Sequence, residues 1–268
     1  MIFRRIAPHV RNQQWTAIVI DLAIVIAGVF IGTQVSNWNE ERVTSRKAEA
    51  FAQSLRSDLR EEAWSSELLL QYNKEVLANA ERAVAALEGK TEMSDEALLT
   101  TAYRATQYKQ KGRRRSTYDE LTSTGAIGLI RDPSLRDTAM RVYTNPMWDN
   151  IAREGIQSEY RRAFRMSLPN DVQQAIATGC GDRPITVGDY AAIKYSLDYP
   201  CRIDLPPEQL AAAAQTVRSN PTLLPLLRLR LADIRTRLFD FTVNNKDMVD
   251  SLREIAATGS QPRPTPGP

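Results

Sequence analysis

The sequence predicts an all-α protein in which one N-terminal transmembrane helix continues into an elongated helical bundle with long antiparallel first and last helices. Three features predict this fold: an apolar stretch near the start, a following run to Leu87 without proline or glycine, and heptad spacing after Asn220. The chain has 268 residues, 43% hydrophobic and 25% charged. The part after the apolar stretch is therefore long enough to bury one sizeable core.

We divide the chain into four parts on this basis. Residues 1–14 are a basic tail, 15–37 the transmembrane helix, 38–257 a helical soluble domain and 258–268 a proline-rich tail. The last part has too little apolar surface to pack, so we expect it to be disordered.

The apolar stretch runs from Trp15 to Val35, and a second tryptophan, Trp38, follows it. A helix between the two indoles spans about 34 Å, which crosses a hydrocarbon core of about 30 Å with an indole at each interface. A cleaved signal peptide is the rival interpretation, but no small-x-small cleavage site follows the apolar run. The sequence therefore favours an uncleaved membrane anchor.

One face of the anchor combines an acid with small residues. At about 100° per residue, Asp21, Gly28 and Gly32 fall on one stripe. Small residues let two membrane helices approach closely, and an acid in their interface can find a hydrogen-bond donor. We expect the span to associate with a second copy or a partner span through this face. The alternative is an acid near the membrane surface with incidental glycines.

A Q-x-x-N-W-N-E motif marks the exit from the span, at Gln34, Asn37, Trp38, Asn39 and Glu40. Together with the acid early in the span, the motif resembles an uncharacterised bacterial family of single-span membrane proteins, whose domain has no known function. Residues 116–143 resemble the same family again, at Tyr118, Leu121, Gly125 and Tyr143. The resemblance implies a single span and a helical body, and it implies no activity.

Two long helices are expected in the soluble domain. The first leaves the membrane and continues until Gly89 stops it. The second begins with Asn220 as N-cap and Pro221 in its first turn, and it keeps heptad spacing to Ile255 with Asn245 at one core position. We expect the two helices to pack antiparallel in one chain. A coiled coil between two chains is the alternative that the periodicity leaves open.

Charged side chains flank this expected seam and would favour one alignment of the two helices. They are Arg228, Arg230, Arg235 and Arg237 on the last helix, and Glu61, Glu62, Glu67 and Glu75 on the first.

Shorter helices are expected between the two long ones, at 95–109, 117–123 and 133–143, with Ser94, Ser116 and Asp132 as their N-caps. Residues 179–207 are the least regular part, and they hold the only two cysteines, Cys180 and Cys201. A disulfide between them would order the loop by removing closure entropy worth about 3 kcal/mol, and it would form in an oxidising periplasm. Two free thiols are the alternative. The pair fits no common zinc site, because no histidine or third cysteine is near.

The basic residues that flank the span are nearly balanced. Three arginines precede it and three basic residues follow it closely: Arg4, Arg5 and Arg11, then Arg42, Arg46 and Lys47. Long domains translocate with little regard to charge, so the cysteine pair decides the orientation. We expect the bacterial inner membrane, with the N-terminus in the cytoplasm and the main domain in the periplasm.

The chain has one dense basic run, formed by Lys109, Lys111, Arg113, Arg114 and Arg115. In a cytoplasmic domain the run would suit anionic lipid headgroups or nucleic-acid phosphates. No aromatic residues interleave it for stacking, and the net charge of the chain is only +3. A solvated loop is the commoner explanation, and nucleic acid is not an expected partner.

No catalytic, cofactor or metal site is predicted. The single histidine, His9, lies in the N-terminal tail, which excludes a histidine-based triad in the body. Residues 89–91 imitate the end of a phosphate-binding loop, but Val84 replaces its leading glycine. The plentiful carboxylates are more typical of caps and surface charges than of general acids, among them Asp119, Glu120 and Asp132.

The sequence therefore favours a membrane-anchored, non-enzymatic helical protein without a cofactor, which binds a protein partner or its own copies, or senses conditions in the cell envelope. The alternative is a cytoplasm-facing module that binds anionic lipid or nucleic acid through the basic run at 109–115.

Overall fold

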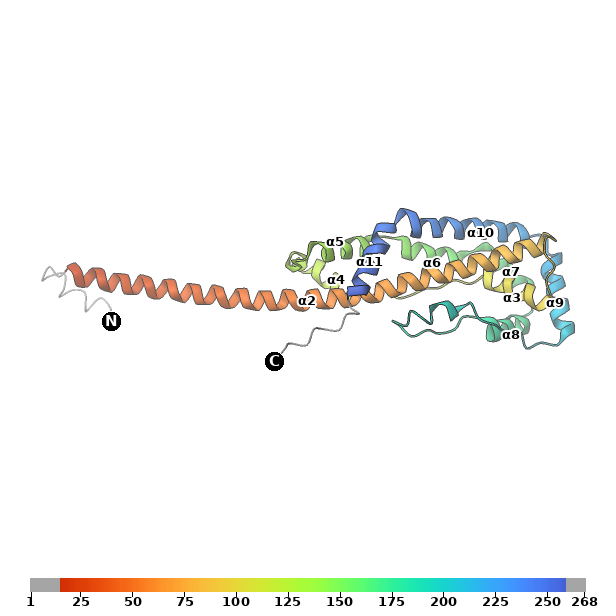
Figure 1. Cartoon of the computed structure of the whole chain (residues 1–268), viewed down its shortest axis with the longest axis horizontal. Coiled ribbons are helices and arrows are strands. Elements are labelled where there is room, and N and C mark those ends of the chain that lie inside the picture. Colours follow the sequence, from red (N-terminus) through yellow and green to blue (C-terminus); the bar gives the residue numbers. More distant parts are fainter. Residues whose placement is uncertain (1–14, 259–268) are drawn as a thin grey trace.

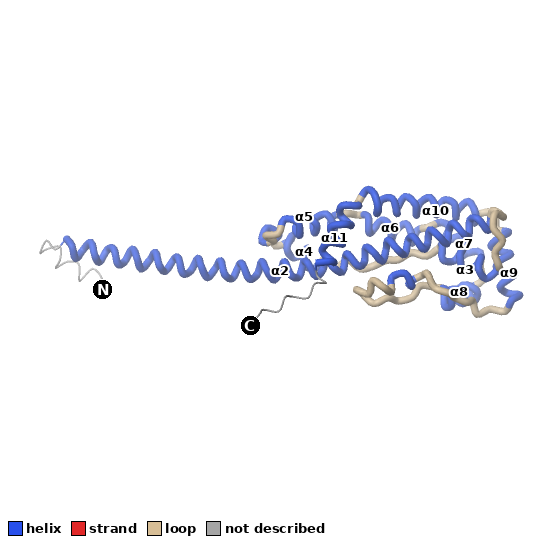
Figure 2. The backbone as a smooth tube through the Cα atoms, in the orientation of Figure 1, coloured by secondary structure: helices blue, strands red, loops and turns tan. Residues whose placement is uncertain are grey.

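The computed structural model describes residues 15–258, and every regular element in that range is helical (Figures 1 and 2). The predicted all-α fold is therefore confirmed. The basic tail with His9 and the proline-rich tail beyond Thr258 lie outside the described residues. In chain order the elements are α2 (Trp15–Leu87), α3 (Asp95–Ala105), α4 (Ser116–Ser123), η1 (Ala126–Leu129), α5 (Pro133–Thr144), α6 (Met147–Gln157), α7 (Glu159–Ser167), α8 (Asn170–Cys180), η2 (Ile193–Ser196), α9 (Pro207–Ser219), α10 (Leu223–Phe239), η3 (Asp240–Asn244) and α11 (Lys246–Thr258).

The first helix, α2, is uninterrupted over 73 residues, or about 110 Å at the usual helical rise. Its N-terminal part projects away from the other helices, which gather around its C-terminal half (Figure 1). The apolar stretch that begins at Ile18 is long and apolar enough to cross a membrane, by length and composition, and its most apolar part buries no side chain in the molecule. Among the described side chains of α2, the first buried one is that of Ala48.

The C-terminus of α2 follows the predicted pattern. Gly89 adopts φ +71°, a left-handed conformation that favours glycine. The amide of Lys90 then donates to the carbonyl of Ala85 at 2.9 Å, which satisfies one of the last free carbonyls of the helix.

Two hydrophobic cores lie along the covered half of α2. The first surrounds Leu55 and Leu59 and receives side chains from α4, α5, α6 and α11. The second surrounds Ala80 and Ala83 and receives side chains from α3, α7, α8, α9 and α10. Tyr72 and Val76 lie between them in a smaller cluster with Ile234 of α10. One helix therefore serves as the spine of both cores.

The last long helix runs antiparallel to the first, as predicted. Arg228 Nε lies 2.9 Å from a carboxylate oxygen of Glu88, and Arg235 lies 2.7 Å from Glu81. As the numbers rise along α10 they fall along α2, which fixes the direction and the alignment of the two helices.

The charged pairs along this seam differ from those expected. Arg230 donates to the carbonyl of Gln107, and Arg237 pairs with Glu154 and Asp240. The four expected glutamates have other partners: Glu61 and Glu62 bind the segment after α3, Glu67 pairs with Arg253, and Glu75 accepts from Gln71. Sequence periodicity identified the correct helices, but it could not give their relative alignment.

The heptad spacing predicted one helix from Asn220 to Ile255, but a bend divides this stretch into two helices. α10 ends at Phe239, the π-helical turn η3 follows, and α11 then crosses α2. Asn245 stabilises this bend and does not set a register, because its side chain donates to the carbonyl of Asp240 and accepts from Asn145 at 2.7 Å. The apolar spacing continues past the bend because Met248 and Leu252 still enter the first core.

The shorter helices agree with the sequence in position and differ at their ends. Asp132 caps α5 as expected, with its carboxylate accepting from the amide of Leu135 at 3.2 Å, and Ser94 caps α3. Ser116 is the first residue of α4 and makes no capping hydrogen bond, so that prediction was wrong.

Two helix boundaries were also wrong. α3 stops at Ala105, short of Lys109, because the Thr106 hydroxyl and the Gln107 amide group both donate to the carbonyl of Tyr103. α10 starts at Leu223, two residues after Pro221, because Asn220 ends α9 and its side chain accepts from the amide of Thr222 at 3.0 Å.

Candidate functional site

The main candidate site is built on residues 107–115, which we call the strap. The strap has no regular secondary structure and joins α3 to α4 alongside α2 (Figure 2). It contains all five residues of the dense basic run. Because α3 belongs to the second core and α4 to the first, the strap connects the two cores across the surface of the spine.

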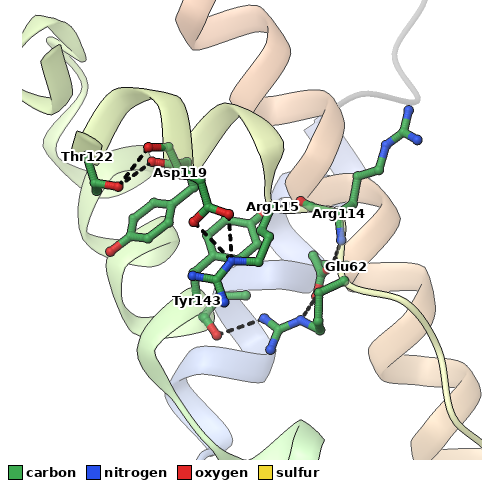
Figure 3. Close-up of polar contacts among 9 residues, drawn as sticks. Glu62, Arg114, Arg115, Asp119, Thr122 and Tyr143 are labelled. Atoms are coloured by element: carbon green, nitrogen blue, oxygen red, sulfur yellow. Dashed lines mark hydrogen bonds and ion pairs between the residues drawn. The ribbon is translucent and has the colours of Figure 1, made fainter. Parts of the chain in front are cut away.

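One end of the strap is held by a buried carboxylate on α2. Glu62 is 3% exposed and accepts from Arg113 Nε and from the backbone amide of Arg114, both at 2.7 Å (Figure 3). Arg113 also donates to the carbonyl of Val142 at 2.9 Å. A buried ion pair is stable only when such additional hydrogen bonds satisfy it, and this one has them.

A tyrosine pair completes this end of the strap. Tyr143 donates its hydroxyl to the carbonyl of Arg114 at 2.7 Å, and its ring stacks on Tyr118 with centroids 4.8 Å apart. Burial raises the pKa of Tyr143 well above its ordinary value, and the charges of Glu62 and Asp58 raise it further. The phenol therefore stays protonated and remains a hydrogen-bond donor.

The other end of the strap is held by a lysine. Lys109 lies 3.2 Å from Asp182, and the hydroxyl of Tyr72 on α2 donates to the same carboxylate. The ammonium of Lys109 also lies 5.3 Å from the centre of the Tyr72 ring. Burial, followed by the charge of Asp182, raises the pKa of Tyr72.

The remaining basic residues are also paired within the chain. Lys111 lies 4.0 Å from Glu61, Arg114 lies 3.3 Å from Glu61, and Arg115 lies 2.9 Å from Asp119. Arg114 and Arg115 remain half-exposed, so their pairs are weak. Every cation of the basic run thus faces a carboxylate of the same chain, and the run is a docked segment rather than the solvated loop expected from the sequence.

Aromatic rings from other elements lie beneath these cations. Lys111 lies 4.5 Å from the centre of the Trp64 ring, and Arg113 lies 5.5 Å from Tyr143 and 5.6 Å from Trp148. These rings are not interleaved with the basic residues in the sequence, so the basic run alone does not predict them. A usable signal was present on α2, where Asp58, Glu61 and Glu62 share one helix face.

Two arginines from distant helices hold the start of the strap. Arg161 of α7 donates to the carbonyl of Thr106 at 3.1 Å, and Arg230 of α10 donates to that of Gln107, also at 3.1 Å. Arg230 is 5% exposed, and burial lowers its pKa. Carbonyls near the end of α3 are thus paired with two guanidinium groups, one partly buried at Arg161 and one buried at Arg230.

A cleft of about 300 Å³ opens beside the strap. Strap residues 109–113 form one wall, and a face of α6 that carries Trp148, Ala152 and Ile156 forms the other. Ser65 and Leu69 of α2 line the cleft between these walls. At one end the walls meet, because Tyr108 packs against Gly155 so closely that a Cβ there would lie 2.3 Å from the Tyr108 Cβ.

The cysteine pair lies next to this assembly. Cys180 and Cys201 are joined by a disulfide, and the Thr100 hydroxyl contacts the sulfur of Cys180 at 3.7 Å. Asp182, which binds Lys109, follows the first cysteine by two residues. Nearby, buried Arg104 donates to the carbonyls of Cys180 and Tyr199. The disulfide therefore anchors the loop that carries one of the partners of the strap.

The residues predicted for membrane association lie on the projecting part of α2. Asp21, Gly28 and Gly32 are exposed, and open space surrounds both glycines. The exit motif Gln34, Asn37, Trp38, Asn39 and Glu40 is exposed on the same helix, where Arg42 lies 5.3 Å from the centre of the Trp38 ring. These residues are far from the cleft along α2.

In the second set of family-like residues, Tyr143 contacts the strap through its hydroxyl. Tyr118 and Tyr143 form the stacked pair, Leu121 is buried in the first core, and Gly125 takes φ +70° before η1. These four positions therefore have structural roles, in packing and in a turn, at the Glu62 end of the strap. Tyr118 and Tyr143 therefore lie at the candidate site, whereas the exit motif does not.

Among residues 15–258, no group of three or more histidine, cysteine, aspartate or glutamate side chains is arranged to hold a metal ion. No protein-family model, no curated protein and no solved structure matches the chain.

Proposed function

We propose that the protein is a membrane-anchored, non-enzymatic helical module that binds a protein partner in the cell envelope. The observation that carries this proposal is the continuity of α2, which joins an uncovered apolar stretch to the spine of both cores without a break. A rigid helix of this kind fixes the strap and its cleft at a set distance from the bilayer. Movement of the span would also move the strap, which offers a route for sensing.

The proposed location is the bacterial inner membrane, with the N-terminus in the cytoplasm and the body in the periplasm. The disulfide supports this orientation, because such bonds persist in oxidising compartments. Fusion of alkaline phosphatase or a fluorescent protein to the C-terminus tests it. We expect an active phosphatase and a dark fluorescent protein. The reverse result would contradict the proposal and favour a cytoplasm-facing module.

Membrane anchoring has its own matched test on α2. Ile26 and Val43 are exposed to a similar degree, 60% and 57%, on either side of the exit motif. Arginine at position 26 costs about 3 kcal/mol at the centre of a span, so Ile26→Arg should release protein from membranes washed at alkaline pH. Val43→Arg should leave it in the membrane fraction. Equal behaviour of the two variants would contradict the proposed span.

The proposed span also offers a contact face. Asp21, Gly28 and Gly32 lie on one stripe, and the open space at both glycines leaves room for a close neighbour. In a membrane two-hybrid assay, we expect Gly28→Ile and Gly32→Ile to reduce association several-fold. Unchanged association in these variants and in Asp21→Leu would contradict this face as the contact.

The alternative role in binding anionic lipid or nucleic acid has less support. Each cation of the strap already faces a carboxylate, so a phosphate would have to displace Glu61, Glu62, Asp182 or Asp119.

A further inference from the structure

Within the strap, residues 108–113 form an extended stretch whose backbone hydrogen-bonding groups have no partner among the described residues. Its side chains alternate: Lys109, Lys111 and Arg113 bind carboxylates beside α2, whereas Gln110 and Gly112 are exposed. This alternation is typical of a β-strand. Among the described residues, no backbone N–H or C=O group of residues 108–113 makes a hydrogen bond.

The row of free backbone groups lies at the cleft. In an extended segment, the N–H and C=O groups point sideways, perpendicular to the alternating side chains. All five residues 109–113 line the cleft, the carboxylate-bound ones and the exposed ones alike, so an extended backbone here would present one edge to it. The opposite wall is a helix, so the cleft has the form of a groove between an extended segment and a helix.

We propose that this groove binds an extended peptide segment of a protein partner, which adds as a β-strand to strap residues 109–113. A peptide backbone repeats its donors and acceptors at the spacing of the strap, so it can pair with the whole row. A compact small molecule would satisfy only one or two of these groups. The inference rests on the proposed function, since it names the partner class and the place where that partner binds.

The groove also specifies side chains of the peptide. Leu69, Trp148 and Ile156 provide an apolar wall for one inward-facing side chain. On α6, Asp149 and Arg153 are exposed at the same cleft and make no ion pair among the described residues. We therefore expect an apolar residue in the bound peptide, flanked by charged residues of both signs. The contact between Tyr108 and Gly155 closes one end of the groove.

The test uses the full chain in lipid nanodiscs and a phage-displayed library of random linear peptides as the probe. Ile156→Trp fills the groove from a position that is 43% exposed, so the fold should tolerate it. Met166→Trp, at a site that is 77% exposed and outside the groove, is the matched control. We expect peptides that bind the wild-type chain and the control equally, and the filled variant at least about tenfold more weakly.

A scan of single N-methyl groups along a selected peptide then tests strand addition itself. Because alternate residues of a β-strand point their N–H groups to the same edge, methylation at every second position should weaken binding about tenfold and the intervening positions should tolerate it. Hydrogen exchange of residues 108–113 should be fast in the free chain and slow at alternate residues in the complex.

Three outcomes would overturn the inference. The first is a library that yields no peptides binding the wild-type chain more tightly than Ile156→Trp. The second is a methylation scan in which the loss of binding does not alternate along the peptide. The third is self-association of the wild-type chain that Ile156→Trp abolishes, which would assign the groove to a second copy. If any of these outcomes occurs while the C-terminal reporter fusions and the Ile26→Arg test give their expected results, the peptide groove is wrong and the proposed function is retained. A failure of the reporter and anchoring tests alone would instead remove the membrane role and not the groove.

Discussion

At the scale of single residues, Glu62 determines how the strap is held. Its two oxygens accept from a buried guanidinium and from a backbone amide, and both donors come from residues that follow α3. The sequence marked the arginines as one basic run and Glu62 as a charge that flanks the expected seam between the two long helices. Neither pattern could pair them, because a contact between residues about fifty positions apart depends on the path of the chain between them.

We expect Glu62→Gln to lower the free energy of unfolding by about 3 kcal/mol, because it leaves the charge of Arg113 buried without its counterion. Chemical denaturation of the full chain in detergent measures this change. Glu49→Gln, at an exposed glutamate of the same helix that has no ion pair with any described residue, should change stability by less than about 0.5 kcal/mol. Similar effects of the two substitutions would contradict the role of Glu62.

Asp132 gives the fold a predictable response to acid. The amide of Leu135, helped by Arg56, holds the pKa of Asp132 below its ordinary value. A carboxyl group with a lowered folded-state pKa stabilises the fold above its unfolded pKa of about 3.9, and this contribution is lost as pH falls through the folded value.

Asp132→Asn keeps a capping acceptor but cannot ionise. We expect it to be less stable than the wild type at pH 7, by up to about 1 kcal/mol because the side chain is partly exposed to solvent. The difference should shrink below about pH 4. Glu120→Gln, at an exposed carboxylate that forms no ion pair within residues 15–258, serves as the control. A difference that is constant with pH would contradict the proposed origin.

At the scale of elements, the sequence predicted helices well and their ends less well. The run without proline or glycine predicted α2, and Gly89 predicted its end. The heptads after Asn220 missed the bend at η3, because Met248 and Leu252 keep the same apolar spacing on either side of it. The strap was missed for a related reason. The alternating basic residues of the strap do not by themselves predict an extended segment, because the carboxylates that hold them lie on other elements.

The disulfide loop is the element for which the loss of one bond has the clearest expected effect on the free energy of unfolding. Cys180 and Cys201 are separated by 21 positions, and opening a loop of this size restores chain entropy worth about 3 kcal/mol in the unfolded state. We expect Cys180→Ala with Cys201→Ala to lower the free energy of unfolding by about this amount and to expose residues 181–200 to proteolysis. Limited proteolysis with mass analysis checks this.

Reduction of the wild-type chain should reproduce the effect, whereas the double variant should not respond to reductant. Cysteines that alkylate fully in the native protein without reductant would contradict the bond and weaken the proposed periplasmic orientation.

At the scale of the whole molecule, one helix connects everything that we assign. The apolar stretch, the exit motif, the buried Glu62 and the floor of the cleft all belong to α2. Residues 15–47 extend over about 50 Å at the helical rise, and none of their described side chains is buried. This arrangement follows from composition, since no residue between the span and Leu87 breaks a helix, and it makes the helix the physical link between bilayer and cleft.

The continuity of α2 in a bilayer is the central claim, and a distance between two spin labels tests it most directly. Glu40 and Lys74 are exposed on α2, the first as the last residue of the exit motif and the second between the two cores. With the full chain in nanodiscs and the native disulfide intact, labels at Glu40→Cys and Lys74→Cys should give one narrow distance distribution near about 51 Å, the length of that helical segment. A broad distribution, or one centred well below that distance, would mean that the helix breaks after the exit motif and would contradict the claim.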